Sequence, residues 1–466
     1  MISSRPEITE VFPAVGKPAL TYVERDEGRY EKNLKNGLLN PGQICVLTGP
    51  SKTGKTSLYR QVLPQIRRQE LTVRCSGNLT PGAFWASALE NLDFRRLSES
   101  SQSWGADLTT KIGVNGEAGW SWLAKIMSSI GFEVSGKGEY GVKKEFITAP
   151  VNAKHLIPLL QEMPIQLIVE DFHYLEDSVK REVFQQWKSF VDEGISVLVV
   201  STTHHATDIA RANQDLSGRV RLIDVGKWEE TDLAKIPAKG FSLLQIKHSQ
   251  VTANNIARES VGLPIITQQI CQQIAFNHDM SPGSIKRSTT ISAHTVVEAQ
   301  KYVAENMYSN HKSDYDQLIT GPRQRRRKHA TYEKILASFA LDPLKFSLSF
   351  SELQERVESL CIDSSNIPSG SIKAALKALE KFQMRKKISL LDWHESEGRL
   401  YIVTPSFLFY LRQMLENSTP GESITQKLLI LFKENLELKM MPGSEDGQSS
   451  LFETAIYLTP KKPDNP

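Results

Sequence analysis

Residues 43–63 read QICVLTGPSKTGKTSLYRQVL, and this stretch decides the fold. Its first part, 43–48, is a short apolar run with several β-branched side chains, which is typical of a buried strand in a parallel sheet. Residues 49–56 fit the pattern G-x-x-x-x-G-K-[ST], and residues 57–63 have helical spacing. A strand, a glycine-rich loop and a helix in immediate succession predict an α/β fold with a P-loop and a parallel sheet.

The loop at 49–56 is suited to a nucleoside triphosphate. Its glycines allow the backbone to curl so that N–H groups point at phosphate oxygens, and the following helix presents its positive end. Lys55 can reach the β- and γ-phosphates, and the hydroxyl of Thr56 can ligate magnesium. A chance match in an ordinary turn is the alternative, and the flanking strand and helix weigh against it. We therefore expect ATP and Mg²⁺ as cofactors, bound by Gly49, Pro50, Ser51, Lys52, Thr53, Gly54, Lys55, Thr56 and Ser57.

A second motif lies at residues 165–175, which read IQLIVEDFHYL. An apolar strand ends here in Glu170 and Asp171, so two acids emerge at the carboxyl edge of the sheet, where ligands bind. In a Walker B element Asp usually precedes Glu, the first acid holding the metal and the second polarising the attacking water. Here the order is exchanged, which places Glu170 at the metal position and the shorter Asp171 at the base position. Because a displacement of about 1 Å can cost on the order of a hundredfold in rate, we expect slow hydrolysis.

Two later segments carry further candidates for the reaction. Residues 195–203 read as a buried strand that ends in hydroxyl groups. In the additional-strand class of P-loop ATPases, a polar residue at the end of this strand senses the γ-phosphate, so the candidate sensors are Ser201, Thr202 and Thr203. Arg219 stands immediately before a fifth apolar segment, where AAA+ proteins carry an arginine finger. Its alternative role is a local ion pair, for example with Asp215.

Two other classes of nucleotide-binding protein fit the motifs less well. Residues 216–218 read LSG, similar to the signature of ABC transporters, but that signature precedes the Walker B element, whereas this one follows it. No N-K-x-D motif is present, which weighs against a GTPase.

Composition sets the outer limits. A chain of 466 residues suggests two or three domains, and 40% hydrophobic with 23% charged residues is typical of a globular protein. It has neither an apolar run of about 18 residues nor a signal segment, so we expect a cytoplasmic protein with no membrane partner. A net charge of +3 indicates no particular partner. No C-x-x-C pair occurs, so we expect reduced thiols at Cys45, Cys75, Cys271 and Cys361.

Downstream of the fifth strand, residues 253–276 have helical spacing and include Gly262-Leu263-Pro264. This element resembles the G-x-P motif of STAND ATPases, whose helical lid closes over the adenine. Together with the P-loop, the Walker B element, Leu-Ser-Gly-Arg-Val220 and Tyr22-Val-Glu-Arg25, it makes the chain similar to bacterial ATPases related to the AAA+ and STAND groups. The resemblance covers roughly residues 20–275. It implies an ATP-driven switch in which the residues flanking the adenine are Tyr22, Val23 and Pro264.

A third region predicts three helices and a hairpin. The helices are expected at 331–339, 351–357 and 369–381, and the hairpin strands at 388–391 and 399–403. This order is similar to a winged helix, as in the C-terminal domains of origin-recognition ATPases. In a DNA-binding use the third helix would enter the major groove with Ser371, Lys373 and Lys377, and the basic run 323–328 would meet phosphates. The alternative is an internal packing module with a solvated charge run.

The sequence therefore predicts an α/β ATPase with a helical lid and a C-terminal winged helix. Its expected parts are an N-terminal arm (1–20), the P-loop core with an insertion near 98–142 (21–226), the lid (227–318), the winged helix (319–415) and a tail (416–466). The leading function is an ATPase switch that assembles with itself or with a partner protein, with Glu170, Asp171 and Arg219 as catalytic residues and Thr56 and Glu170 at the metal. The alternative is a DNA-loading ATPase of the origin-recognition type. A small-molecule kinase is disfavoured, because P-loop kinases seldom carry a lid and a winged helix.

Overall fold

A computed structural model describes residues 6–14, 16, 18–91, 153–202, 218–280, 290–320, 331–361, 367–416, 426 and 428. Several expectations from the sequence lie outside these residues. They concern the insertion near 98–142, the basic run 323–328, the tail after 416, Thr203 and Asp215.

The chain divides into two compact units. The first unit contains Met1–Val23, Pro50–Gly54 and Lys227–Pro466, and the second contains Glu24–Gly49 and Lys55–Gly226. The glycine-rich motif at 49–56 is therefore divided between the two units. Gly49, Lys55 and Thr56 belong to the second unit, whereas residues 50–54 belong to the first.

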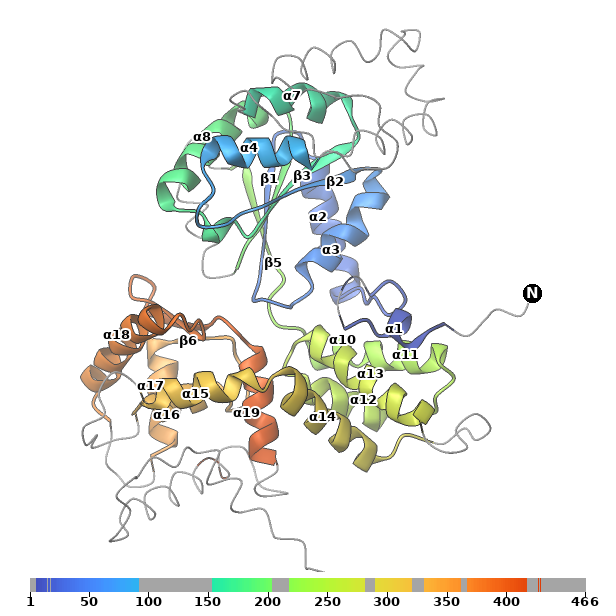
Figure 1. The fold of residues 1–466 in the computed structure, drawn as a ribbon, viewed down its shortest axis with the longest axis vertical. Coiled ribbons are helices and arrows are strands. Elements are labelled where there is room, and N and C mark those ends of the chain that lie inside the picture. The colour runs from blue at the N-terminus through green and yellow to red at the C-terminus, as the bar shows by residue number, and fades with distance from the viewer. Residues whose placement is uncertain are drawn as a thin grey trace, which may run out of the picture. The chain divides into compact units, whose positions relative to one another are not determined.

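The second unit is built on a five-stranded sheet (Figure 1). Its strands are β1 (Ile44–Thr48), β2 (Gln69–Arg74), β3 (Ile165–Glu170), β4 (Val197–Val200) and β5 (Val220–Asp224). All pairings are parallel, and the order across the sheet is β2-β3-β4-β1-β5. The predicted α/β class is thereby confirmed.

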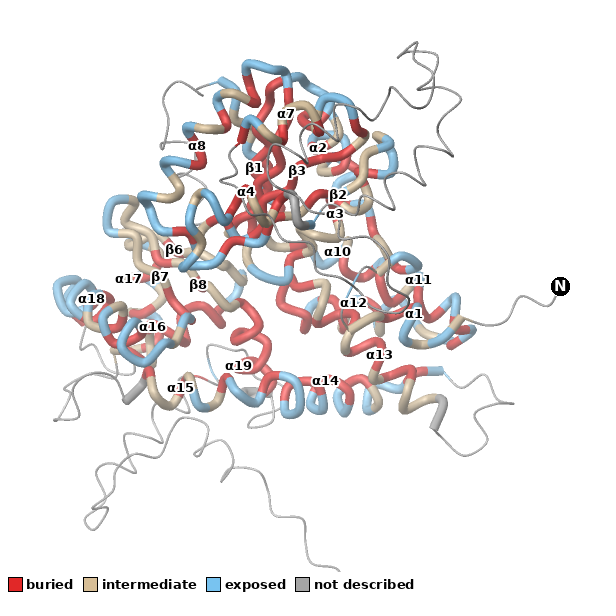
Figure 2. Tube along the Cα trace, turned by 45° about the horizontal axis from the view of Figure 1, so that its top comes forward, coloured by how far each residue is buried: buried red, intermediate tan, exposed pale blue. Residues whose placement is uncertain are grey.

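Helices cover both faces of this sheet, because its central strands are apolar on both sides. Cys45 and Leu47 of β1 pack on one face with buried side chains of α2 (Arg29–Leu39) and α3 (Lys55–Val62). Ile44 and Val46 pack on the other face with side chains of α4 (Pro81–Glu90), α7 (Ala153–Glu162) and α8 (Asp177–Asp192). Every residue of β1, β3 and β4 is buried, and Figure 2 shows β1 and β3 as buried segments. Short 3₁₀ turns complete this unit at Asp26–Gly28, Leu63–Ile66 and Phe172–Tyr174.

The first unit begins with α1 (Ile8–Val11) and continues, after β5, as a set of helices. These are α10 (Glu230–Leu233), α11 (Lys235–Leu243), α12 (Gln250–Glu259), α13 (Pro264–Met280), α14 (Ala293–Met307) and α15 (Asn310–Thr320). The predicted helical region at 253–276 is thus two helices, separated by a turn at 260–263. Phe12 is fully buried, with its ring centroid 5.3 Å from that of Phe241, so the segment around α1 is part of this core.

The C-terminal part of the first unit combines helices with a small antiparallel sheet. Its helices are α16 (Thr331–Ser338), α17 (Phe350–Ser359), α18 (Ser369–Lys386) and α19 (Ser406–Glu416). Its strands, β6 (Ser347–Ser349), β7 (Leu391–His394) and β8 (Arg399–Ile402), pair in the order β6-β8-β7.

One predicted strand was misplaced in this region. The sequence pattern put the first hairpin strand at 388–391, but the strand begins at Leu391. Helix α18 runs on to Lys386, and the buried side chain of Gln383 bonds the backbone of Leu390 and Leu391. Residues 388–390 are therefore needed to connect the helix to the strand. Along the part of the chain that the structure describes, no helix has both the length and the apolar character to cross a bilayer.

Candidate nucleotide site

Polar side chains gather at the carboxyl edge of the five-stranded sheet because the parallel strands end together. In the register of the strands, Arg74 aligns with Glu170, Glu170 with Val200, and Thr48 with Asp224. Strand β4 lies between β1, which leads into the glycine-rich loop, and β3, which ends in the two acids.

Lys55 is the first residue of α3, and its ammonium group turns back toward the loop. Its Nζ donates a hydrogen bond to the carbonyl oxygen of Gly49 over 2.6 Å. Burial lowers the pKa of Lys55 to about 8, against the opposing effects of Asp171, Asp224 and Glu170. The lysine is thus surrounded by acids but largely desolvated, a setting in which a phosphate anion would stabilise its charge.

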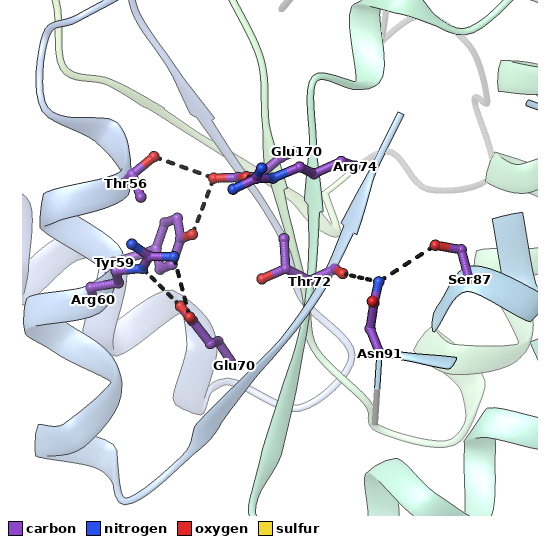
Figure 3. Close-up of polar contacts among 9 residues, drawn as sticks. All are labelled: Thr56, Tyr59, Arg60, Glu70, Thr72, Arg74, Ser87, Asn91 and Glu170. Carbon is purple, nitrogen blue, oxygen red and sulfur yellow. Dashed lines mark hydrogen bonds and ion pairs between the residues drawn. The ribbon is translucent and has the colours of Figure 1, made fainter. Parts of the chain in front are cut away.

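The carboxylate of Glu170 is the centre of the polar network in Figure 3. Its Oε1 accepts hydrogen bonds from the hydroxyls of Thr56 at 3.2 Å and Tyr59 at 3.1 Å, and its Oε2 accepts from Nε of Arg74 at 3.2 Å. Glu170 is buried, whereas the Arg74 side chain is 75% exposed. The structure therefore brings together two residues that the sequence assigned to the metal, Thr56 and Glu170.

Two residues of this network, Tyr59 and Arg74, were not predicted from the sequence. Tyr59 lies three residues after Thr56, so helical spacing puts both on one face of α3, and this spacing was the available signal. The tyrosine is fully buried, and burial together with Glu170 raises the pKa of its phenol. Arg74 carried no comparable signal, because its place beside Glu170 follows only from the pairing of β2 with β3.

The donor set fits magnesium. Thr56 and Glu170 offer a hydroxyl and a carboxylate oxygen, the hard ligands that Mg²⁺ prefers, and Mg²⁺ usually keeps several waters beside one or two protein ligands and the phosphates. Among the described residues no group of three or more His, Cys, Asp or Glu side chains could hold a metal ion without such help. The residues present suit an ion that arrives with a nucleotide.

Asp171 differs from Glu170 in setting. Its backbone is left-handed, with φ 59° and ψ 30°, and the residue is exposed. Partial burial of the carboxyl group and the neighbouring Glu170 raise its pKa, while Arg74 and Lys55 lower it. The positive φ turns the chain away from the strand direction directly after Glu170, so the two acids are presented differently.

The candidate sensors and Arg219 lie at opposite edges of the sheet. Ser201 follows β4 and is buried, and no described residue forms a hydrogen bond with its hydroxyl. Thr202 next to it is half-buried. Arg219 is exposed and precedes β5, and its carbonyl oxygen accepts from the N–H of Ile44, where β1 begins. Because β5 runs parallel to β1, Arg219 lies at the edge opposite Thr48. The structure therefore does not bring it together with Thr56 and Glu170.

Residues 50–54 of the loop pack within the first unit. The Thr53 hydroxyl donates to the carbonyl oxygen of Pro50 at 2.8 Å, and the indole N–H of Trp228 donates to the carbonyl oxygen of Thr53 at 2.8 Å. The ammonium of Lys52 lies 5.0 Å from the ring centroid of Tyr308, a cation–π distance. Ser51 and Lys52 are exposed, whereas Thr53 is buried.

The residues proposed to flank the adenine also belong to the first unit. Val23 is buried in its hydrophobic core together with Leu263, the residue before Pro264. The carbonyl oxygen of Tyr22 accepts a hydrogen bond from Lys239 at 2.7 Å. Pro264 is the first residue of α13.

Comparisons with protein-family models and with curated proteins gave no match. Among solved structures, the chain is similar to a Walker-type ATPase of Pyrococcus abyssi at 14% identity and a TM-score of 0.48, covering 86% of this chain and 99% of that one. It is similar to Cdc6p from Pyrobaculum aerophilum at 13% identity and a TM-score of 0.38, covering 92% of this chain and 98% of that one. The RuvB Holliday junction branch migration motor of Thermotoga maritima matches at 14% identity and a TM-score of 0.37, covering 84% and 98% of the two chains.

Proposed function

We propose that this chain binds ATP with Mg²⁺ and hydrolyses it slowly, as a molecular switch that assembles with itself or with a partner protein. One observation carries the proposal. The hydroxyl of Thr56, in the P-loop motif, lies 3.2 Å from the carboxylate of Glu170, in the Walker B position. A hydroxyl and a carboxylate brought together from these two motifs are the pair that holds magnesium beside a nucleotide in P-loop ATPases.

In this proposal each residue has a separate task. Lys55 exchanges the Gly49 carbonyl for phosphate oxygens, and Thr56 and Glu170 hold the metal ion. The bound magnesium neutralises charge that develops on the phosphate oxygens. Asp171 orients the attacking water, and its short side chain and left-handed backbone make slow turnover the expected result. Tyr22, Val23 and Pro264 contact the adenine.

Arg219 is proposed to act on the nucleotide site of a neighbouring subunit. Arg219 lies at the amino edge of the sheet, opposite Thr48, and is therefore remote from the proposed phosphate site of its own chain. An arginine that stabilises the transition state can be worth on the order of a thousandfold in turnover. We propose that it supplies this charge in trans, which makes turnover dependent on self-assembly.

A second candidate function is loading onto DNA. We propose that α16, α17 and α18 with the β6-β8-β7 sheet form a winged helix, whose α18 exposes Ser371, Lys373 and Lys377. Two of these side chains already have partners. Lys377 pairs with Glu395 at 2.8 Å, and Lys373 lies 4.9 Å from the ring centroid of Phe350. The Lys377–Glu395 pair is exposed and contributes little, so DNA could displace it.

The Lys55→Ala variant is expected to lose ATP binding while keeping its fold, because the lysine is a charge presented to phosphates. In the wild type, affinity should also depend on pH. Above the pKa of about 8, the free protein holds Lys55 increasingly neutral, whereas bound phosphates keep it charged. Binding then takes up a proton, and the dissociation constant should rise up to about tenfold per pH unit.

Calorimetric titration between pH 7.5 and 9.5 would measure this dependence. Lys55→Arg is the matched control, since its guanidinium stays charged throughout and its affinity should not change with pH. Tight ATP binding by Lys55→Ala would refute the proposed site.

The two acids should separate binding from turnover. Glu170→Gln is expected to weaken nucleotide binding only when magnesium is present, because it removes a metal ligand. Asp171→Asn should bind ATP as the wild type does but lose hydrolysis, because it removes the base. Equilibrium binding with magnesium or with EDTA, alongside phosphate release, distinguishes the two. Wild-type turnover by Asp171→Asn would reject the assignment of the base.

A mixing experiment tests Arg219. Arg219→Ala and Lys55→Ala are each expected to be inactive alone. Mixed, they should partly recover phosphate release, since an intact P-loop can then meet an intact arginine from another copy. The role in trans is wrong if Arg219→Ala alone is fully active, or if the mixture stays inactive although the two proteins co-assemble.

Salt dependence separates the two candidate functions. A protein that neutralises phosphates on duplex DNA loses affinity with a log–log slope of about −0.9 per contact. If DNA is the partner, replacing Arg325, Arg326 and Arg327 together by alanine should flatten the slope measured by fluorescence anisotropy. No duplex binding at low salt would eliminate the DNA-loading function and leave the switch.

A further inference from the structure

Three carbonyl groups of the glycine-rich motif are held by donors. Lys55 donates to Gly49, the Thr53 hydroxyl donates to Pro50, and the indole of Trp228 donates to Thr53. The peptide unit is planar and trans, so its C=O and the following N–H point in opposite directions. A donor that fixes a carbonyl therefore also fixes the direction of the next amide.

Trp228 fixes the direction of the Gly54 amide in this way, because it donates to the Thr53 carbonyl oxygen. Holding the Thr53 carbonyl points the Gly54 N–H away from the indole. The ring also lies against the glycine, because a Cβ built on Gly54 would meet Cζ2 of Trp228 at 3.7 Å. Gly54 has φ +91°, and glycine has more backbone freedom than any other residue. An external hydrogen-bond donor is therefore needed to fix the direction of its amide.

Trp228 is itself fixed by the turn that precedes α13. Its backbone N–H donates to the carbonyl oxygen of Gly262 at 3.2 Å, and the residue is only 8% exposed. Gly262 has φ +79°, and a Cβ there would lie 2.1 Å from Cγ of Lys227 and 3.4 Å from the carbonyl oxygen of Trp228. A side chain at position 262 would therefore clash with the side chain of Lys227, the residue before Trp228, and would need a positive φ. The Gly-Leu-Pro turn thus has a task apart from any contact with adenine.

We propose that Trp228 is a positioning residue of the nucleotide site, which aims the Gly54 amide at the phosphates and is held in place by Gly262. The inference rests on the proposed function, since it assigns Trp228 a role in phosphate binding. A tryptophan that merely fills the core would contribute to stability alone. The two roles differ in their effect on affinity.

Trp228→Phe keeps an aromatic ring beside Gly54 but removes the N–H donor. The buried Thr53 carbonyl then loses its partner, and the peptide can turn. The dissociation constant for ATP should rise about tenfold, the order expected for one lost hydrogen bond. Trp187→Phe is the matched control. Trp187 is fully buried in the second unit, and its indole nitrogen has no hydrogen-bond partner among the described residues, so this variant should lose stability without losing affinity.

A pair of glycines gives an independent test. Gly262→Ala introduces both a positive-φ alanine and a clash with the Lys227 side chain next to Trp228, whereas Gly218→Ala introduces only the first. Gly218 has φ +80°, and within the described part of the chain nothing lies within 4 Å of a built Cβ. Gly262→Ala should weaken binding as Trp228→Phe does, and Gly218→Ala should not.

Each full-length variant is titrated with ATP and with inorganic tripolyphosphate, and its unfolding midpoint is measured. A selective loss of affinity for both ligands in Trp228→Phe and Gly262→Ala supports the proposal. If the wild type binds tripolyphosphate but not ATP, and Trp228→Phe weakens it, the positioning role stands while the ATP function fails. Equal affinities of Trp228→Phe and Trp187→Phe, or no binding of either ligand by the wild type, overturn it.

Discussion

The order of the strands is the constraint on which the rest of the second unit depends. Thr56 and Glu170 are far apart in sequence, and they meet because β3 and β1 are separated by one strand and end at the same edge. Parallel strands need crossover connections, and in this unit helices on both faces of the sheet bury the strands. The pairing of β2 beside β3 then brings Arg74 to the other oxygen of the same carboxylate.

The charged groups at this edge contact partners within the protein. Glu170 accepts from a hydroxyl of the P-loop motif, a buried phenol and an exposed guanidinium, and Lys55 donates to a backbone carbonyl. A buried charge without partners would be costly, so these contacts stabilise an edge that is otherwise ready for an anion and a cation.

The sequence predicts what is local and misses what depends on tertiary pairing. The strand, loop and helix at 43–63 and the acids at 170 and 171 are contiguous, and both segments form as expected. Tyr59 needed only the helical period, but Arg74 and Trp228 reach the site through neighbours remote in sequence. Strand β6 has three residues, Ser347–Ser349, too few to show an alternating pattern. In the misplaced strand at 388–391, Leu390 is buried in the core and Ile388 packs against it although both precede β7, and burial outside a strand gives the same apolar signal.

The chain passes from one compact unit to the other after Val23, Gly49, Gly54 and Gly226. A gene segment encoding only residues 24–226 would carry the whole P-loop motif yet omit the indole that holds the Thr53 carbonyl. The motif and the indole that contacts it are therefore encoded apart, and the first can be transferred without the second. If Trp228 has the role proposed above, recombination that joined this core to an unrelated C-terminal region would transfer the motif without the donor that orients the Gly54 amide.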